Sequence, residues 1–321
     1  MQDSKEKFDW KKLISNRAVF LIFLNILIII FMAFLSPYFL RLDNLLNMTK
    51  YGAVLLLIAM GQTVVILGGG GGIDLSLGSL ISLSGIILGI LVTNGVNVWV
   101  ACFLTFVFGV LIGLLQGFLI AYLKMPAFAV TLGGLYTYGA LALVITNGIP
   151  VSGFPTEFGF LGQGTFLGLP AQVMLVVIPV FIILYWVLNK TTFGRSIYLI
   201  GVNDKAANLS GINVEKTRML LYGISGGTAA LAAIINTAWF MTARPDAGYG
   251  LELQAITVAV LGGIHIFGGV GSLAGTLLAG LTITIIGYGM QIANINTIWQ
   301  LAVLGFLLLG AVILNKLASK R

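Results

Sequence analysis

Long uncharged apolar stretches, separated by short charged segments, make up most of the chain after residue 17. A helix needs about 20 apolar residues to cross the hydrocarbon core of a bilayer. The uncharged stretches cover residues 18–40, 51–73, 75–123, 125–156, 158–189, 219–243 and 253–315. The first, second and sixth have the length of one span each. The pattern therefore predicts a membrane protein with many spans.

Loop-forming residues divide the longer stretches. Breaks fall at 93–97, at 147–150, in a glycine-rich loop that closes at Pro170, and at 262–275 and 291–296. We therefore predict an all-α fold with about ten transmembrane helices in a single transmembrane domain over residues 1–321. The predicted helices cover residues 18–40, 51–68, 73–93, 98–122, 127–146, 171–189, 218–241, 252–266, 271–290 and 297–315.

The basic residues predict the orientation. With the N-terminus in the cytoplasm, 14 of the 17 Lys and Arg residues lie inside: five in 1–17, Lys124, five in 190–218 and three after 315. Only Arg41, Lys50 and Arg244 lie outside. Because cytoplasmic loops carry an excess of Lys and Arg, we predict two cytoplasmic termini, a cytoplasmic tail over 1–17 and a cytoplasmic loop over 190–218. The same bias explains the net charge of +7 without a nucleic-acid partner.

Composition excludes several function classes. Hydrophobic residues make up 59% of the chain and charged residues 8%, against about 25% charged in soluble domains. One Cys and one His cannot form a disulfide or a metal cluster, and the Gly-Lys pair of a phosphate-binding loop is absent. We therefore expect no metal, no cofactor and no catalytic residue. The chain is predicted to be no enzyme, and any ATP hydrolysis should occur on a partner.

Glycine is abundant, at 42 of 321 residues. Part of this excess has four-residue spacing, which lets membrane helices approach closely. These packing glycines are Gly85 and Gly89, then Gly109, Gly113 and Gly117, then Gly223 and Gly227.

Two other glycine clusters predict interrupted helices. Five successive glycines occupy 68–72, and a second cluster lies within 262–275. Each glycine costs a helix interior up to about 1 kcal/mol relative to Ala, so helices should end there. Transporters place binding and gating elements at such breaks. The sequences ILGG at 66–69 and VLGG at 260–263 also suggest a weak internal repeat.

Asp74 follows the first cluster and has two interpretations. It either caps the next helix by accepting from the amide of Ser76 or Leu77, or it takes part in a gate or pathway. His265 is interpreted as a loop residue in preference to a proton relay or metal ligand. The candidates for the pathway or gate are Gln62, Thr63, Gly72, Asp74, Ser76, Asn236, Trp239, Gly263 and Gly269.

The segment 190–218 is the one long polar segment between predicted spans. Asn203 can cap a short helix through Leu209, with Gly211 as its stop. Its small apolar surface could lie on lipid headgroups or dock to a cytoplasmic protein, and we favour docking because the helix is short. The residues of this surface are Ala206, Ala207, Leu209 and Ile212.

An ordered series of motifs supports a family resemblance. They are GQTVVI at 61–66, GGIDLSLGS at 71–79, KMPAF at 124–128, TLG at 131–133, NG at 147–148, GR at 194–195, GVN at 201–203, LSGINV at 209–214, LELQAI at 251–256, LGG at 261–263 and GT at 275–276. Over nearly its whole length the chain resembles the permease subunits of bacterial ATP-binding-cassette (ABC) sugar importers, which include ribose, rhamnose and autoinducer permeases. It departs from the pattern in the all-glycine stretch before Ile73 and in Val270.

The resemblance implies a pathway for a monosaccharide (ribose or a similar pentose or deoxyhexose) in the bacterial cytoplasmic (inner) membrane, in contact with lipid. It implies three partners: a cytoplasmic ATPase subunit, a second permease copy (homodimer or paralogous heterodimer) and an extracytoplasmic solute-binding protein, which the loops 41–50, 147–170 and 243–252 would meet. An autoinducer importer is the alternative, and a stand-alone channel or secondary sugar carrier is the alternative of another class. The residues implied in coupling to the ATPase are Asn203, Asp204, Lys205, Ala206, Leu209, Ser210, Gly211 and Ile212.

Overall fold

The structure is a computed structural model that describes residues 17–296, 298–300, 302–307 and 309–310. The predicted tail therefore lies outside the described residues except for Arg17, and the predicted span at 297–315 lies partly outside them.

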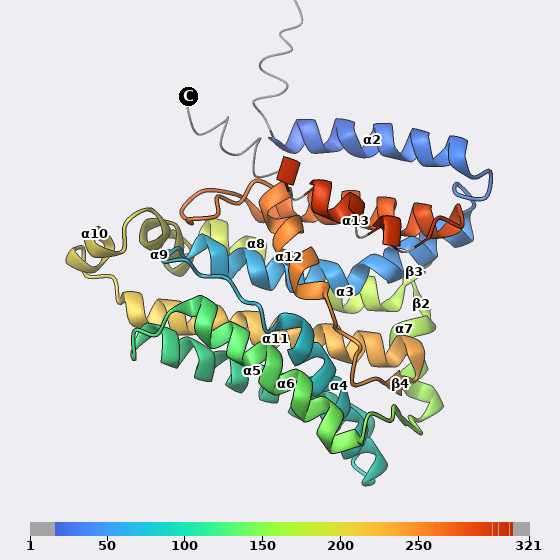
Figure 1. Ribbon diagram of the computed structural model, residues 1–321, viewed down its shortest axis with the longest axis horizontal. Coiled ribbons are helices and arrows are strands. Elements are labelled where there is room, and N and C mark those ends of the chain that lie inside the picture. Colours follow the sequence, from blue (N-terminus) through green and yellow to red (C-terminus); the bar gives the residue numbers. More distant parts are fainter. Residues whose placement is uncertain (1–16, 297, 301, 308, 311–321) are drawn as a thin grey trace, which may run out of the picture.

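Helices dominate the described residues (Figure 1). They are α2 (Arg17–Leu35), α3 (Leu42–Leu67), α4 (Leu77–Thr93), α5 (Val98–Ala121), α6 (Ala127–Thr146), α7 (Gly159–Gln163), α8 (Ile178–Lys190), α9 (Thr192–Val202), α10 (Asp204–Leu209), α11 (Val214–Phe240), α12 (Leu251–Leu261) and α13 (Leu273–Ile292). A π-helical turn, Val173–Val177, leads into α8. The all-α prediction is confirmed.

Seven helical segments of the described chain are long and apolar enough to cross a membrane: α2, α3, α5, α6, α11, α13 and Val173–Lys190. The apolar helices α4 and α12 are shorter. Two small antiparallel strand pairs complete the fold. In one, β1 (Val151–Ser152) pairs with β4 (Thr242–Ala243), and in the other β2 (Thr165–Phe166) pairs with β3 (Leu169–Pro170).

Helix ends differ from the predictions where a charged residue sets the predicted end of a helix. Helix α3 begins at Leu42, nine residues before the predicted start, and contains Asp43 and Lys50. Charged side chains end the apolar part of a helix but do not end its hydrogen bonding. Helix α6 has the predicted bounds, because Pro126 and the left-handed Asn147 mark its two ends.

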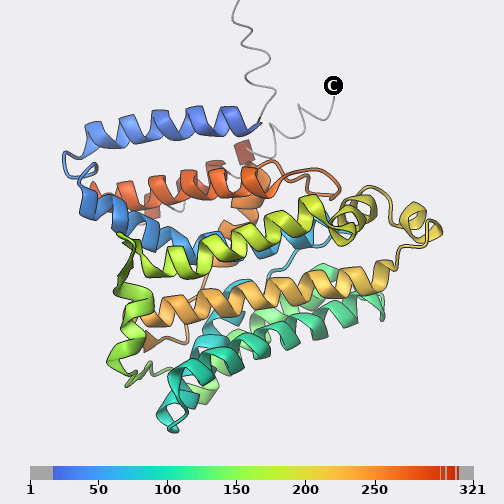
Figure 2. The same ribbon diagram turned by 180° about the vertical axis from the view of Figure 1, so that it is seen from behind.

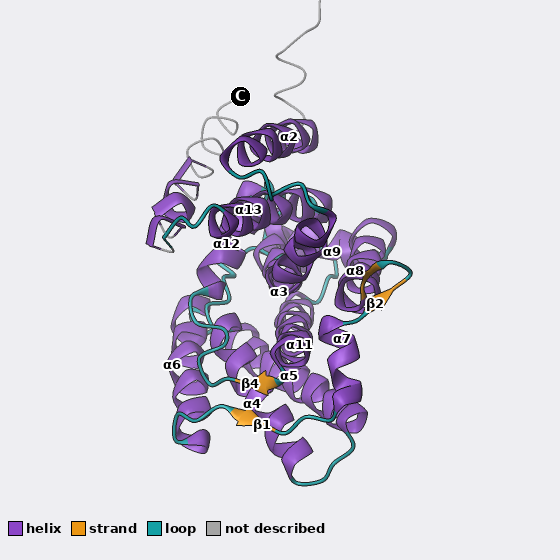
Figure 3. Ribbon diagram, turned by 90° about the vertical axis from the view of Figure 1, so that its right-hand side faces the viewer, coloured by secondary structure: helices purple, strands orange, loops and turns teal. Residues whose placement is uncertain are grey.

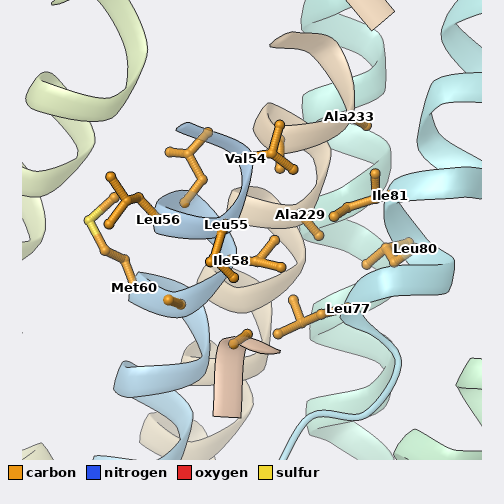
Figure 4. Packing of buried hydrophobic residues seen from close by; sticks show 14 of the residues in the cluster. Val54, Leu55, Leu56, Ile58, Met60, Leu77, Leu80, Ile81, Ala229 and Ala233 are labelled. Atoms are coloured by element: carbon orange, nitrogen blue, oxygen red, sulfur yellow. The ribbon is translucent and has the colours of Figure 1, made fainter. Parts of the chain in front are cut away.

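Helices α3 and α11 lie at the centre of the molecule (Figure 3). Most of their side chains are buried, whereas most of those of α2, α5, α6 and α8 are partly or fully exposed, and many of these are large and apolar. In the core, Ile58 of α3 lies near Leu77 of α4 and Ala229 of α11 (Figure 4). Exposed apolar helices around a buried pair are the arrangement expected where lipid covers the outer face.

The predicted packing glycines bring α5 against α11. A Cβ atom on Gly109 would lie 2.6 Å from the carbonyl oxygen of Gly226, and one on Gly117 would lie 2.6 Å from that of Met219. From α11, Gly223 and Gly227 face Leu114 and Val110 of α5 in turn. The prediction of a close glycine-lined helix contact is confirmed for these glycines, which join α5 to α11. It is wrong for Gly89 of α4, which faces the side chains of Val151 in β1 and Ala243 in β4.

The bundle has two distinct ends (Figures 1 and 2). One end, which we call the α10 end, carries α9 and α10, and Lys124 reaches it through an ion pair with Glu215 in the first turn of α11 (2.7 Å). The other end, the strand end, carries the β-strands and α7, and Lys50 donates there to the carbonyl oxygen of Gln163 (3.3 Å). Arg244 follows β4 at the strand end.

Candidate functional site

The first glycine segment, residues 68–76, joins α3 to α4 without helical structure. Gly69, Gly70 and Gly71 have φ values of +66°, +64° and +69°. Residues with a Cβ rarely adopt this left-handed conformation, and three in succession require glycine. The glycine run therefore sets the path of the chain between these two buried helices.

The second glycine segment, residues 262–272, joins α12 to α13. The amide of His265 donates to the carbonyl oxygen of Val270 (2.9 Å), and the amide of Gly268 donates to that of His265 (2.8 Å). The imidazole of His265 lies against the ring of Phe267. These contacts place His265 in a tight turn, as predicted for a loop residue. The described residues contain no group of three or more His, Cys, Asp or Glu that could hold a metal.

The two glycine segments touch each other. The amide of Gly269 donates to the carbonyl oxygen of Leu67 at the end of α3 (3.0 Å). A Cβ atom on Gly268 would lie 2.5 Å from the Cα atom of Gly69. Two segments almost 200 positions apart in the chain thus meet backbone to backbone.

Asp74 is fully buried and accepts three hydrogen bonds. The backbone N–H and the hydroxyl of Ser76 donate to Oδ1 (3.0 and 2.7 Å), and the hydroxyl of Ser225 in α11 donates to Oδ2 (2.8 Å). Both carboxylate oxygens are therefore satisfied, as burial of this group requires.

Three further side chains hold the first glycine segment around Asp74. With its amide assigned to satisfy both partners, Gln62 of α3 donates to the carbonyl oxygen of Asp74 (3.1 Å) and accepts from its N–H (3.2 Å). Gln116 of α5 donates to the hydroxyl of Ser76 (2.9 Å). Thr131 of α6 donates to the carbonyl oxygen of Ile73 (3.1 Å). Four helices thus fix residues 73–76, and we call this arrangement the Asp74 cluster.

The structure confirms one part of the prediction that Asp74 caps the next helix and contradicts another. The predicted bond from the Ser76 amide to Asp74 is present. The predicted position of the N-cap is wrong by two residues, because α4 begins at Leu77 and its N-cap is Ser76, not Asp74.

The other pathway candidates have partners outside the Asp74 cluster. Thr63 bonds to Thr276 of α13 through their hydroxyls (2.8 Å), and the amide of Gly72 donates to the carbonyl oxygen of Gly69 (3.1 Å). Gly263 lies against Arg17. Asn236 and Trp239 lie near the strand end of α11, where Gln163 donates to the carbonyl oxygen of Trp239. Their roles in a pathway stay predictions.

The predicted short helix of the 190–218 segment is present as α10. Asn203 is its N-cap and accepts from the amide of Ala206 (3.1 Å). Gly211 follows with φ +84° and ends it. Leu209 is 90% exposed, and Lys205 and Ser210 are exposed as well. Helix and stop are confirmed.

The prediction that four apolar residues form one exposed surface on this helix is wrong. Ala207 is buried and Ile212 half-buried, and both pack inward against Ile200 of α9 and Val214 of α11. Only Ala206 and Leu209 of the predicted surface face outward. Asp204, at the start of α10, lies 3.8 Å from the guanidinium of Arg218.

A surface depression lies at the strand end. It is lined by Leu143, Gly148, Pro150, Phe240, Thr242, Arg244, Pro245 and Asp246. Arg244 donates to both carboxylate oxygens of Asp246 (3.1 and 2.8 Å), and this hydrogen bonding lowers the pKa of the Asp246 carboxyl. Residues of two loops that are expected to face outward, 147–170 and 243–252, line this depression.

Sequence reasoning missed Gln116 and Ser225. Gln116 had a readable signal, since it is the one Gln in the uncharged stretch 75–123, and a buried amide needs a partner. Ser225 had none, because Ser in a glycine-rich helix also suits plain packing.

Comparison with known proteins places the chain in a family. The family model for "Branched-chain amino acid transport system / permease component" matches residues 44–312. The chain is 39% identical to the ribose import permease protein RbsC of Bacillus subtilis over 91% of each chain, and 38% identical to that of Escherichia coli K12 over 88% of each. It is 36% identical to the autoinducer 2 import system permease protein LsrD of Enterobacter sp. 638, over 94% of this chain and 93% of LsrD. No solved structure matches. The chain therefore belongs to the permease family of the branched-chain amino acid transport system type.

Proposed function

We propose that the chain is the membrane-spanning permease subunit of an ABC importer, and that it forms the pathway for ribose or a similar pentose or deoxyhexose. The observation that carries this proposal is its 39% identity to a ribose import permease over nine-tenths of both chains. The chain is a multi-pass protein of the bacterial cytoplasmic membrane. ATP is bound and hydrolysed by a separate subunit, and the chain itself carries no cofactor.

The proposed topology has about ten membrane-embedded helices and two cytoplasmic termini. The seven long segments, α4, α12 and the apolar helix within 298–307 supply them. The α10 end faces the cytoplasm, because Arg17, Lys124 and the 190–218 segment gather there while Lys50 and Arg244 lie at the strand end. The glycine segments then interrupt the membrane-embedded structure near the cytoplasmic side.

The proposed partners follow from the two ends. The ATPase subunit docks at α10, whose exposed Leu209 offers an apolar contact next to polar Lys205 and Ser210. A solute-binding protein docks at the strand end, where the exposed Arg244 and Asp246 suit a polar rim contact. A second permease copy completes the pathway.

In this proposal the first glycine segment is part of the gate. The Asp74 cluster holds this segment in place and does not line an open passage. Gln62, Asp74 and Ser76 are all fully buried in the conformation described. They fix one end of the first glycine segment, and the exposed Gly71, where a Cβ would meet no heavy atom within 4 Å, is the part that faces open space.

Co-purification tests the partner. The chain should retain the ATPase subunit, and the variant Leu209→Arg should lose it, because it places a charge at an apolar contact. Leu199→Arg, a half-exposed leucine on α9, is the matched control and should retain it. A wild-type chain that binds no ATPase would refute the proposal.

A second candidate substrate is the autoinducer sugar, which the 36% identity to LsrD favours. The stand-alone carrier is the rival class. It requires sugar flux in liposomes that contain this chain alone, whereas an ABC permease shows uptake only with the ATPase and ATP.

A further inference from the structure

Helix α9 connects the proposed docking helix to the rest of the molecule. Asn203 ends α9, with its amide donating to the carbonyl oxygen of Leu199 (3.1 Å), and the same residue caps α10. Ile200 of α9 and Ala207 of α10 share one buried apolar cluster. Because the two helices are joined at one residue and packed together, α9 and α10 form a single rigid body.

The last turn of α9 contacts both glycine segments. The hydroxyl of Tyr198 donates to the carbonyl oxygen of Gly271 (3.2 Å). A Cβ atom on Gly201 would overlap the carbonyl oxygen of Leu67 and the amide nitrogen of Gly269. A Cβ on Gly69 would in turn lie 2.8 Å from the Cα atom of Gly201. We call this three-way contact the α9 junction.

We propose that α9 passes the movement of α10 to both glycine segments at once, and that Tyr198 and Gly201 are the positioning residues of this coupling. The inference rests on the proposed function, since it takes α10 as the ATPase contact. It goes beyond that function by naming the contact through which the gate is driven.

The first glycine segment is held at both ends. The α9 junction holds residues 67–69, and the Asp74 cluster holds residues 73–76. Gly70 and Gly71 between them are exposed, and a Cβ on Gly71 would meet no heavy atom within 4 Å. A shift of α9 against the fixed cluster therefore acts on these two glycines, which have the widest backbone freedom.

Loosening the junction should uncouple transport. Tyr198→Phe removes the hydroxyl but keeps the ring, so sugar taken up per ATP should fall about fivefold, the equivalent of one neutral hydrogen bond. ATPase binding should be unchanged, because Tyr198 is not on α10. Tyr185→Phe on the exposed face of α8 is the matched control and should change nothing. Equal coupling in both variants would overturn the inference while leaving the proposed function intact.

Hydrogen exchange tests the junction without the ATPase. In the full chain in detergent, Gly201→Ala should speed amide exchange in residues 68–72 and 262–272 together, by about tenfold or more. Faster exchange in only one segment, or in neither, contradicts a shared junction. A wild-type chain that retains no ATPase, with exchange still coupled, refutes the proposed function and keeps the junction.

Discussion

Replacing Asp74 by Ala tests how the first glycine segment is held. The substitution removes the carboxylate that accepts from the Ser76 amide and from the Ser225 hydroxyl. The Ser76 hydroxyl keeps Gln116 as an alternative partner. Two buried donors are thus orphaned, at about 1–3 kcal/mol each, so the free energy of unfolding should fall by about 2–6 kcal/mol.

The assay is equilibrium unfolding in mixed detergent, followed by amide exchange in residues 68–76. Glu157→Ala, at an exposed carboxylate, is the control and should change the unfolding free energy by less than about 0.5 kcal/mol.

Asp74→Asn should cost less than Asp74→Ala, about 0–2 kcal/mol, because one amide oxygen can still accept from Ser76 and the amide NH₂ can donate to the Ser225 hydroxyl. The reasoning is refuted if Asp74→Ala lies within about 1 kcal/mol of the Glu157→Ala control.

Two further predictions concern the helix contact and the strand end. Gly113→Val places a Cβ 2.8 Å from the carbonyl carbon of Tyr222, so it should destabilise the α5–α11 contact by about 1–3 kcal/mol or more, measured by thermal unfolding. Gly133→Val, whose Cβ meets no heavy atom within 4 Å, is its control, and equal losses would contradict the close contact. Arg244→Gln should reduce the unfolding free energy at pH 7 by less than about 1 kcal/mol, because both partners are about half exposed. The lowered pKa of Asp246 adds stability only while the carboxyl is ionised, so the difference between wild type and variant should start to shrink as pH falls below about 4 and vanish below the lowered pKa. A difference that grows in acid would contradict this sign.

Much of the helix layout could be predicted from apolar length and from helix-ending residues. Helix α6 has its predicted bounds, and the residues at its two ends, Pro126 and Asn147, can be read in the sequence. Charge gaps were a poorer guide, as Lys50 shows, since a charge near the membrane surface can stay inside a helix. The short helix α10 was predicted from Asn203 and Gly211, whose cap and stop are local effects.

The candidate site was predicted only in part, because its contacts are not local. Gln62, Asp74 and Ser76 are candidates because they are polar residues in apolar surroundings, and the fold brings these three together. Asn236 satisfied the same criterion but lies towards the strand end of α11. The sequence shows that a polar residue lies in an apolar stretch, where an unpaired polar group is costly in a membrane. Which partner forms its hydrogen bond is seen only in the tertiary structure.

The meeting of the two glycine segments could not be predicted from their composition. Glycine runs predict where helices end, and both segments are non-helical. Gly268 and Gly69 approach closely, and Gly201 of α9 contacts both segments; this arrangement depends on the packing of three separate elements.

Ribose uptake by reconstituted liposomes tests the central claim most directly. Liposomes should contain the chain with its ATPase subunit, and the solute-binding protein should be added with labelled ribose outside. We predict uptake that requires ATP, the ATPase subunit and the binding protein together. Uptake by the chain alone, or uptake indifferent to ATP, would contradict the account.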